Sequence, residues 1–226
     1  MQIVLDSKDL DYAFMFALQK ANSIKVEEFK PFFNNLPVDP YIKGNYRFRS
    51  LSRFKVSSAG KLIKLPHGYL FQSKHYNPLL GDIRREFAEL DDAILELEEF
   101  KKLVFAFNDY CKLHTEAREI GVHQIRTTCS RHNYGNPAPE GIHRDGTDLI
   151  AIFSVDREHI QGGETHLYKS RKESAVFNKV LNPGEMLLLN DREFFHFTTP
   201  IKPKSFEREG TRDVFVLTCP SLLSEY

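Results

Sequence analysis

Short strand-like segments follow one another almost without interruption from residue 122 towards the end of the chain. They are rich in β-branched and aromatic residues, and glycine, proline or asparagine separates several of them, at 133–135, 162–163 and 183–184. Short strands with turns of this kind are typical of a β-sandwich or barrel. We expect strands at 122–129, 149–155, 164–169, 176–181, 185–190, 194–198 and 212–219.

The first half of the chain combines helical patterns with one further strand. Between residues 7 and 34, apolar residues recur at mostly helical spacing, which predicts one or two short helices. Residues 46–54 alternate like a strand, and residues 83–111 show the three-and-four rhythm of one long or two shorter amphipathic helices. Helices first and a sheet afterwards predict an α+β fold, a double-stranded β-helix (a jelly-roll, cupin-like barrel) with flanking α-helices.

A chain of 226 residues is expected to form one domain, 1–226. Within it we expect an N-terminal helical part at 1–45, a strand with flanking helices at 46–120 and the jelly-roll core at 121–226. The 31 basic residues balance the 31 acidic residues, so no net field attracts nucleic acid or an anionic membrane. The expected partner is therefore a small molecule.

The cysteines and the N-terminal residues indicate a compartment. Cys111, Cys129 and Cys219 are odd in number and scattered, which favours reduced thiols over a disulfide framework. The first residues lack a basic segment followed by a long apolar run, and no uncharged apolar window of about 18 residues exists to span a bilayer. We therefore expect a cytoplasmic protein.

Three residues have the chemistry of metal ligands. His143 and Asp145 stand two positions apart, so on an extended chain both side chains point to the same face and can bind one ion. His196 lies in a later strand and would reach the same ion through the fold. Two imidazoles and one carboxylate occupy one face of an octahedron, the arrangement that suits non-haem Fe(II) oxygenases. We predict that these three residues bind a metal ion.

Two further features lie on strand or loop positions near this candidate site. Arg47, Arg49 and Arg53 share one face of the strand expected at 46–54, and this face is either solvated or holds a carboxylate in bidentate fashion. The segment 130–141 is a loop that leads to His143, and it is either a lid or an ordinary surface connection.

Several blocks of sequence, in order, resemble the Fe(II)/2-oxoglutarate dioxygenases: His143-Arg-Asp145, His196-Phe-Thr-Thr-Pro200 and Arg212-Asp-Val-Phe-Val-Leu-Thr218. Four more blocks, at 46–54, 70–77, 121–126 and 162–165, resemble the branch that hydroxylates free L-amino acids, the isoleucine hydroxylases among them. The resemblance extends from about residue 46 to residue 219.

This resemblance implies the activity. A member of the branch decarboxylates 2-oxoglutarate to succinate with dioxygen while it hydroxylates a free aliphatic L-amino acid. His143, Asp145 and His196 would hold Fe(II). Arg212 would bind the distal carboxylate of 2-oxoglutarate, which a planar guanidinium matches well. Alternation along 212–219 would turn Arg212 inward.

The charged groups of an amino-acid substrate need polar partners. Gln124 and Arg126 share one face of the strand expected at 122–129 and are candidates for this role. The alternatives for this face are solvation or an internal salt bridge.

Two other functions remain open at this point. The same iron chemistry on a peptide or protein side chain, or on an amino-acid derivative, would need a wide, charged cleft. A non-enzymatic cupin-like module that holds metal structurally would need a fourth protein ligand if the metal were zinc, and the sequence suggests none.

Overall fold

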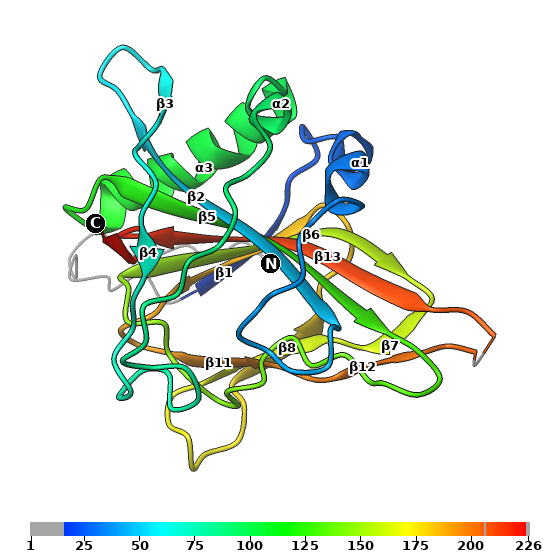
Figure 1. The fold of residues 1–226 in the computed structure, drawn as a ribbon. Helices are drawn as coiled ribbons and strands as arrows, with labels where there is room; N and C mark the ends of the chain where they lie inside the picture. The colour runs from blue at the N-terminus through cyan, green and yellow to red at the C-terminus, as the bar shows by residue number, and fades with distance from the viewer. Residues whose placement is uncertain (1–15, 206, 225–226) are drawn as a thin grey trace.

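The computed structural model describes residues 16–205 and 207–224 of the chain (Figure 1). Seven strands form a major sheet in which every neighbouring pair is antiparallel. In spatial order they are β1 (Phe16–Lys20), β10 (Glu185–Asn190), β6 (Leu149–Glu158), β13 (Gly210–Cys219), β5 (Glu119–Cys129), β2 (Arg47–Val56) and β3 (Leu62–Lys64).

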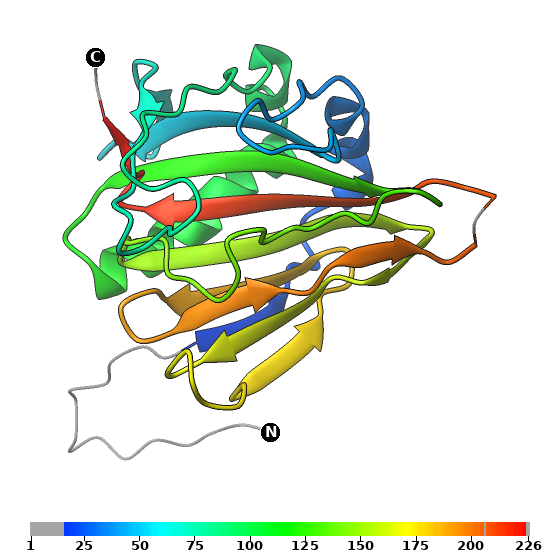
Figure 2. The ribbon, with the colours of Figure 1, turned by 60° about the horizontal axis from the view of Figure 1, so that its bottom comes forward.

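The three-stranded sheet and the two-stranded sheet that contains β12 complete the barrel on the side away from the helices (Figures 1 and 2). The three-stranded sheet has the order β11-β8-β9, and two-stranded sheets pair β12 with β7 and β14 with β4. Their strands are β4 (Tyr69–Leu70), β7 (Ile160–Gly162), β8 (Glu164–Tyr168), β9 (Phe177–Val180), β11 (Phe195–Thr198), β12 (Ile201–Pro203) and β14 (Leu223–Ser224). This is the predicted jelly-roll barrel with helices outside it.

Alternation along β6 shows how the two faces of the major sheet differ. Leu149, Ala151 and Phe153 pack into the larger core cluster, which also contains the helices. Ile150 and Ile152 point the other way, into the cluster between the sheets. Since successive side chains of a strand face opposite sides, an uninterrupted apolar run is the pattern of a strand buried on both faces.

The helices cover the outer face of the major sheet (Figure 1). They are the 3₁₀ turn η1 (Val26–Glu28) and the helices α1 (Lys30–Phe33), α2 (Asp92–Leu95) and α3 (Glu98–His114). Phe100, Val104 and Phe107 of α3 are buried at helical spacing, as the periodicity predicts. None of the helices in the described residues is long and apolar enough to cross a membrane.

Two elements differ from the prediction. Residues 16–20 carry a helical spacing but form the edge strand β1, because their backbone pairs antiparallel with β10 from Phe16 to Lys20. The residues from Ile83 to Asp91 precede the helices instead of starting them: Arg85 bridges to Leu70 and Ala88 bridges to Ser50. In both places backbone pairing with a neighbouring strand overrides the local spacing. Leu10 and Phe14 lie outside the described residues.

Candidate metal centre

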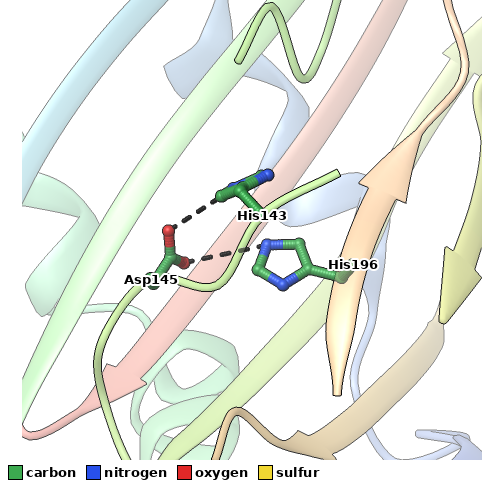
Figure 3. Close-up of side chains that lie close together, drawn as sticks. All are labelled: His143, Asp145 and His196. Atoms are coloured by element: carbon green, nitrogen blue, oxygen red, sulfur yellow. Dashed lines mark ion pairs between the residues drawn. The ribbon is translucent and has the colours of Figure 1, made fainter. Parts of the chain in front are cut away.

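His143, Asp145 and His196 meet on one wall of the barrel (Figure 3). One potential ligand atom of each lies within 4.8 Å of the others, and among the residues that the structure describes these three form the group that could hold a metal ion. The backbones of His143 and His196 hydrogen-bond to each other in both directions, at 3.1 and 2.8 Å. The prediction that His196 reaches the pair through the fold is therefore correct.

Asp145 reaches the site from a turn, not from a regular strand. The segment between His143 and β6 has no ladder, and the positive φ of Gly146, +85°, turns the chain directly after Asp145. A Cβ at Gly146 would lie 2.7 Å from the ring of Tyr76, so both conformation and space require glycine there. This turn directs the carboxylate towards the two imidazoles.

Both imidazoles present Nε2 to the carboxylate. His143 Nε2 is 3.5 Å from Asp145 Oδ1, and His196 Nε2 is 3.9 Å from Asp145 Oδ2. His143 Nδ1 donates to the carbonyl of Gly141 at 2.9 Å, and His196 Nδ1 lies 3.7 Å from Asp191 Oδ1. A metal-binding histidine is oriented in this way, with its second nitrogen turned to a carbonyl or carboxylate.

The charges of the three side chains are strongly coupled. Burial and the neighbouring His143 lower the pKa of His196 to about 3. Burial opposes the charged form of His143, but Glu140 and Asp145 outweigh it and raise its pKa to about 9. The hydrogen bond from His143 and the nearby imidazoles hold the pKa of Asp145 well below its usual range, against the effect of burial. The group contains one carboxylate and two imidazole rings, the donor set that suits Fe(II), and His143 must lose its second proton for a metal ion to bind.

Asp191 supports this group from behind. It is almost fully buried, and its carboxylate accepts hydrogen bonds from the backbone N–H groups of Asp145, Gly146 and Thr147, at 3.1, 2.8 and 3.1 Å. Burial and the charge of Asp145 raise the pKa of Asp191 to about 7. One carboxylate therefore fixes the turn that carries Asp145 and faces the ring of His196.

We expect the Asp191→Asn protein to bind Fe(II) about 10–100-fold more weakly than the wild type, the usual effect of losing a partner that orients a metal ligand. The amide replaces one acceptor oxygen with a donor that faces the backbone N–H groups. Anaerobic Fe(II) titration measures the change. Asp109→Asn on the exposed face of α3 is the matched control. Equal affinities in the two variants would show that Asp191 does not support the site.

The group opens onto a cavity inside the barrel. The cavity measures about 840 Å³, including space continuous with solvent, and is lined by residues of β2, β5, β6, β11 and β13 and of the loops before β6 and α2. Arg212, Val214 and Val216 line it, whereas Phe215 and Leu217 pack under the helices. The inward face predicted for β13 is therefore correct. A metal group that opens onto a cavity with both charged and apolar side chains can hold a small polar molecule beside the ion.

A family model for 2OG-Fe dioxygenases matches residues 30–218, a range that contains all three residues of the metal group. The chain belongs to this family. Fe(II) and 2-oxoglutarate are therefore the cofactor and the cosubstrate of this dioxygenase, and dioxygen is its second cosubstrate. The three-residue group is the Fe(II) site that the family implies.

The dioxygenase is similar to characterised and solved proteins. It is 25% identical, over 203 residues, to the 3(1)-hydroxy-L-isoleucine 4-dioxygenase of Pantoea ananatis (strain AJ13355), covering 86% of this chain and 80% of that protein. A bsmA homologue from Methylobium petroleophilum PM1 is 28% identical with a TM-score of 0.79, covering 91% of this chain and 88% of that one. IDO from Bacillus thuringiensis is 20% identical with a TM-score of 0.74, covering 90% and 92%. The two structures confirm the double-stranded β-helix.

The arginine face of β2 is not solvated in the dioxygenase. Arg47, Arg49 and Arg53 are all buried, which excludes the first of the two alternatives considered for this face. Arg47 pairs with Asp39 at 2.8 Å, and Arg53 donates to the carbonyl of Pro66 at 2.8 Å. Arg49 lines the cavity, so it is available to an anionic ligand.

Gln124 and Arg126 lie on the wrong face of β5 to contact a ligand in the cavity. Gln124 donates to the carbonyl of Phe32, at 3.1 Å, and Arg126 forms a bidentate pair with Asp213, at 2.7 and 2.6 Å. The cavity is lined by the alternate residues of this strand, His123, Ile125 and Thr127. The assignment of Gln124 and Arg126 to substrate binding is therefore corrected: the two do share a face, but that face packs under α1, and the internal salt bridge is the alternative that holds for Arg126.

Other residues of the dioxygenase's site were not predicted. Gln72 donates to both Oδ1 and the carbonyl of Asp145, at 3.1 and 2.9 Å, and Arg85 donates to Gln72 at 2.5 Å. Glu140, in the loop 130–141, places Oε1 3.1 Å from His143 Nε2. Gln72 falls in the block 70–77 that resembles the family, which was the one available signal. The others lie in irregular segments without periodicity.

Proposed function

We propose that this dioxygenase hydroxylates a free aliphatic L-amino acid and decarboxylates 2-oxoglutarate to succinate in the same reaction. The bound iron and cosubstrate supply the oxidation of an unactivated carbon. The residues of the chain bind both organic molecules, orient the amino-acid side chain and exclude water.

The enclosed position of the metal group is the observation that carries this proposal. His143 and His196 are buried, and the side chain of Asp145 is only 18% exposed. A side chain of a folded protein would have to enter the barrel to reach this group, whereas a free amino acid brings no attached chain into the cavity that the group lines. The name of the Pantoea ananatis relative, whose substrate is a hydroxylated isoleucine, supports the same substrate class.

In this proposal Arg212 binds the distal carboxylate of 2-oxoglutarate. Arg212 is buried and lines the cavity, and its strand neighbour Asp213 is already engaged by Arg126. Within the part of the chain that the structure describes, Arg212 has no ion pair. A buried guanidinium of this kind is suited to a carboxylate that enters from solution.

Succinate formation with a panel of substrates tests the proposal. We expect aliphatic L-amino acids to raise succinate formation above the rate with 2-oxoglutarate alone, with leucine, isoleucine and methionine separated by modest factors. One methylene in an apolar pocket changes binding by only about 1–3 kcal/mol. Stimulation by peptides or N-acylated amino acids but by no free amino acid would favour the peptide or derivative alternative. No succinate under any condition would favour a metal-binding module without activity.

A further inference from the structure

Two buried arginines face the cavity without an acidic partner. Arg49 is 8% exposed and Arg85 is 2% exposed. Neither forms an ion pair within residues 16–205 and 207–224. The Nε atom of each is buried and has no hydrogen-bond partner. An unpaired buried cation is unfavourable, so these donors are arranged for an anion that is supplied by a ligand.

Each guanidinium is fixed from behind. Arg49 donates to Nδ1 of His123 and lies over the ring of Phe87, 4.5 Å from its centroid. Arg85 donates to Gln72, which in turn donates to the metal ligand Asp145. Burial lowers the pKa of Arg49 to about 9, which leaves it cationic at neutral pH, and burial also lowers the pKa of Arg85. A guanidinium has five N–H donors, so both residues retain donors for a carboxylate.

Glu140 supplies the opposite charge in the same cavity. Its Oε1 is 3.1 Å from His143 Nε2, the nitrogen that faces Asp145 and would bind the metal ion. His143 cannot bind a metal ion through Nε2 and donate from it at once, so the loaded protein leaves Glu140 without this donor. Glu140 is also the carboxylate that acts most strongly on Arg85, yet the two form no ion pair in the described chain. The cavity therefore holds separated charges of opposite sign.

We propose that Arg49 and Arg85 bind the α-carboxylate of the substrate and that Glu140 accepts its α-ammonium group. A free amino acid carries both charges on one carbon, so it satisfies both sides of the cavity at once. The aliphatic side chain then lies among apolar residues that line the same space, among them Leu70, Leu80 and Leu222. This assignment rests on the proposed function and names the residues that select a free amino acid over its derivatives.

The link through Gln72 gives the carboxylate site a positioning role. Gln72 hydrogen-bonds Arg85 on one side and Asp145 on the other, so the substrate anchor and the metal ligand belong to one hydrogen-bonded chain. The α-carbon is therefore held at a fixed place relative to the metal site, and the side chain determines which carbon reaches it.

Binding measurements on the protein loaded with Fe(II) and 2-oxoglutarate, without dioxygen, test this assignment. The probes are L-isoleucine, 3-methylpentanoic acid, which lacks the ammonium group, and L-isoleucinamide, which lacks the carboxylate. We expect Arg85→Met to lower the affinity for L-isoleucine and for 3-methylpentanoic acid by at least about tenfold. The affinity for L-isoleucinamide should not change. We expect Glu140→Gln to lower the affinity for L-isoleucine and for L-isoleucinamide by a similar factor. The affinity for 3-methylpentanoic acid should not change. Arg85→Lys should restore part of the lost affinity, since it restores the charge.

Two exposed residues provide matched controls. Arg84→Gln changes the adjacent arginine, whose guanidinium lies over Tyr69, and Glu116→Gln changes an exposed glutamate. Both should bind all probes like the wild type. The affinities for 2-oxoglutarate and for Fe(II) are measured in every variant.

Each adverse result has a distinct meaning. If the Arg85→Met and Glu140→Gln proteins both bind L-isoleucine as tightly as the wild type, the assignment is overturned but the proposed function is not. A weaker affinity of Arg85→Met for 2-oxoglutarate alone assigns Arg85 to the cosubstrate and overturns it as well. Loss of Fe(II) binding in Glu140→Gln makes Glu140 a metal ligand and rejects its role in binding ammonium. Wild-type protein that binds none of the probes overturns the proposed function and this assignment together.

Discussion

The Asp145→Ala protein is expected to form no succinate and to bind Fe(II) at least about a hundredfold more weakly than the wild type. Asp145 is the anionic member of a group otherwise made of two imidazoles, and both of its oxygens face a histidine Nε2. Loss of a residue that merely orients a ligand costs about 10–100-fold in metal affinity, so loss of the ligand itself should exceed that range. Anaerobic Fe(II) titration and succinate formation measure the two effects.

A matched control separates this effect from a general loss of structure. Asp109→Ala removes an exposed carboxylate on α3, far along the chain from the metal group, and should retain wild-type Fe(II) affinity. The unfolding temperature of both variants is measured alongside. A fully active Asp145→Ala protein would reject the metal site assigned to His143, Asp145 and His196.

The Arg212→Met protein is expected to have a KM for 2-oxoglutarate that is higher than that of the wild type by a factor of at least several tens. Burial lowers the pKa of Arg212 to about 9, which still leaves it cationic at neutral pH. Loss of one partner of a buried charge pair costs on the order of 2–5 kcal/mol, and about 1.4 kcal/mol corresponds to a factor of ten. Methionine retains much of the side-chain volume, so the change tests the charge. The measurement is the KM for 2-oxoglutarate at saturating amino acid.

Arg208→Gln is the control for Arg212, because Arg208 is exposed and donates a hydrogen bond to His159 at 3.2 Å. An unchanged KM in Arg212→Met would assign the cosubstrate carboxylate to another cationic side chain of the cavity, Arg49 or Arg85. Arg126 is excluded from this role by its position, because it pairs with Asp213 on the other face of the sheet.

Regular alternation made much of the fold predictable. The run from Leu149 to Val155 is buried on both faces, and each of the strands expected after residue 122 has a counterpart in the barrel. The metal group was predictable from its residue types, the two-residue spacing of His143 and Asp145 and the strand context of His196, although Asp145 lies on a turn and not on the extended strand that the spacing suggested.

Two kinds of information were not in the local pattern. Alternation along β5 shows that Gln124 and Arg126 share a face, but both faces of this strand are buried, and the pattern does not say which one turns to the cavity. Ile120 and Val122 pack under the helices, and Gln124 lies on the same face of the strand, so it also faces the helices and not the cavity. Burial on both sides removes the polar–apolar contrast that would mark the inside.

The supporting residues of the site come from irregular segments. Gln72, Arg85 and Glu140 lie outside the helices and the long strands, and long-range packing alone brings them to the metal group. Residues 16–20 show the same limit in the fold, since only pairing with β10 makes them a strand. Positions that are set by long-range packing or by pairing with a distant strand do not show a regular spacing in the sequence.

The most direct test of the account is mass spectrometry of each of the twenty amino acids after incubation with the protein, Fe(II), ascorbate, 2-oxoglutarate and isotopically labelled dioxygen. We expect one or more aliphatic L-amino acids to gain a single labelled oxygen atom, with succinate formed in equal amount, and we expect the Asp145→Ala protein to produce neither. If no free amino acid gains oxygen while a peptide or an N-acylated amino acid does, the chain is still a dioxygenase but the substrate class proposed for it is wrong.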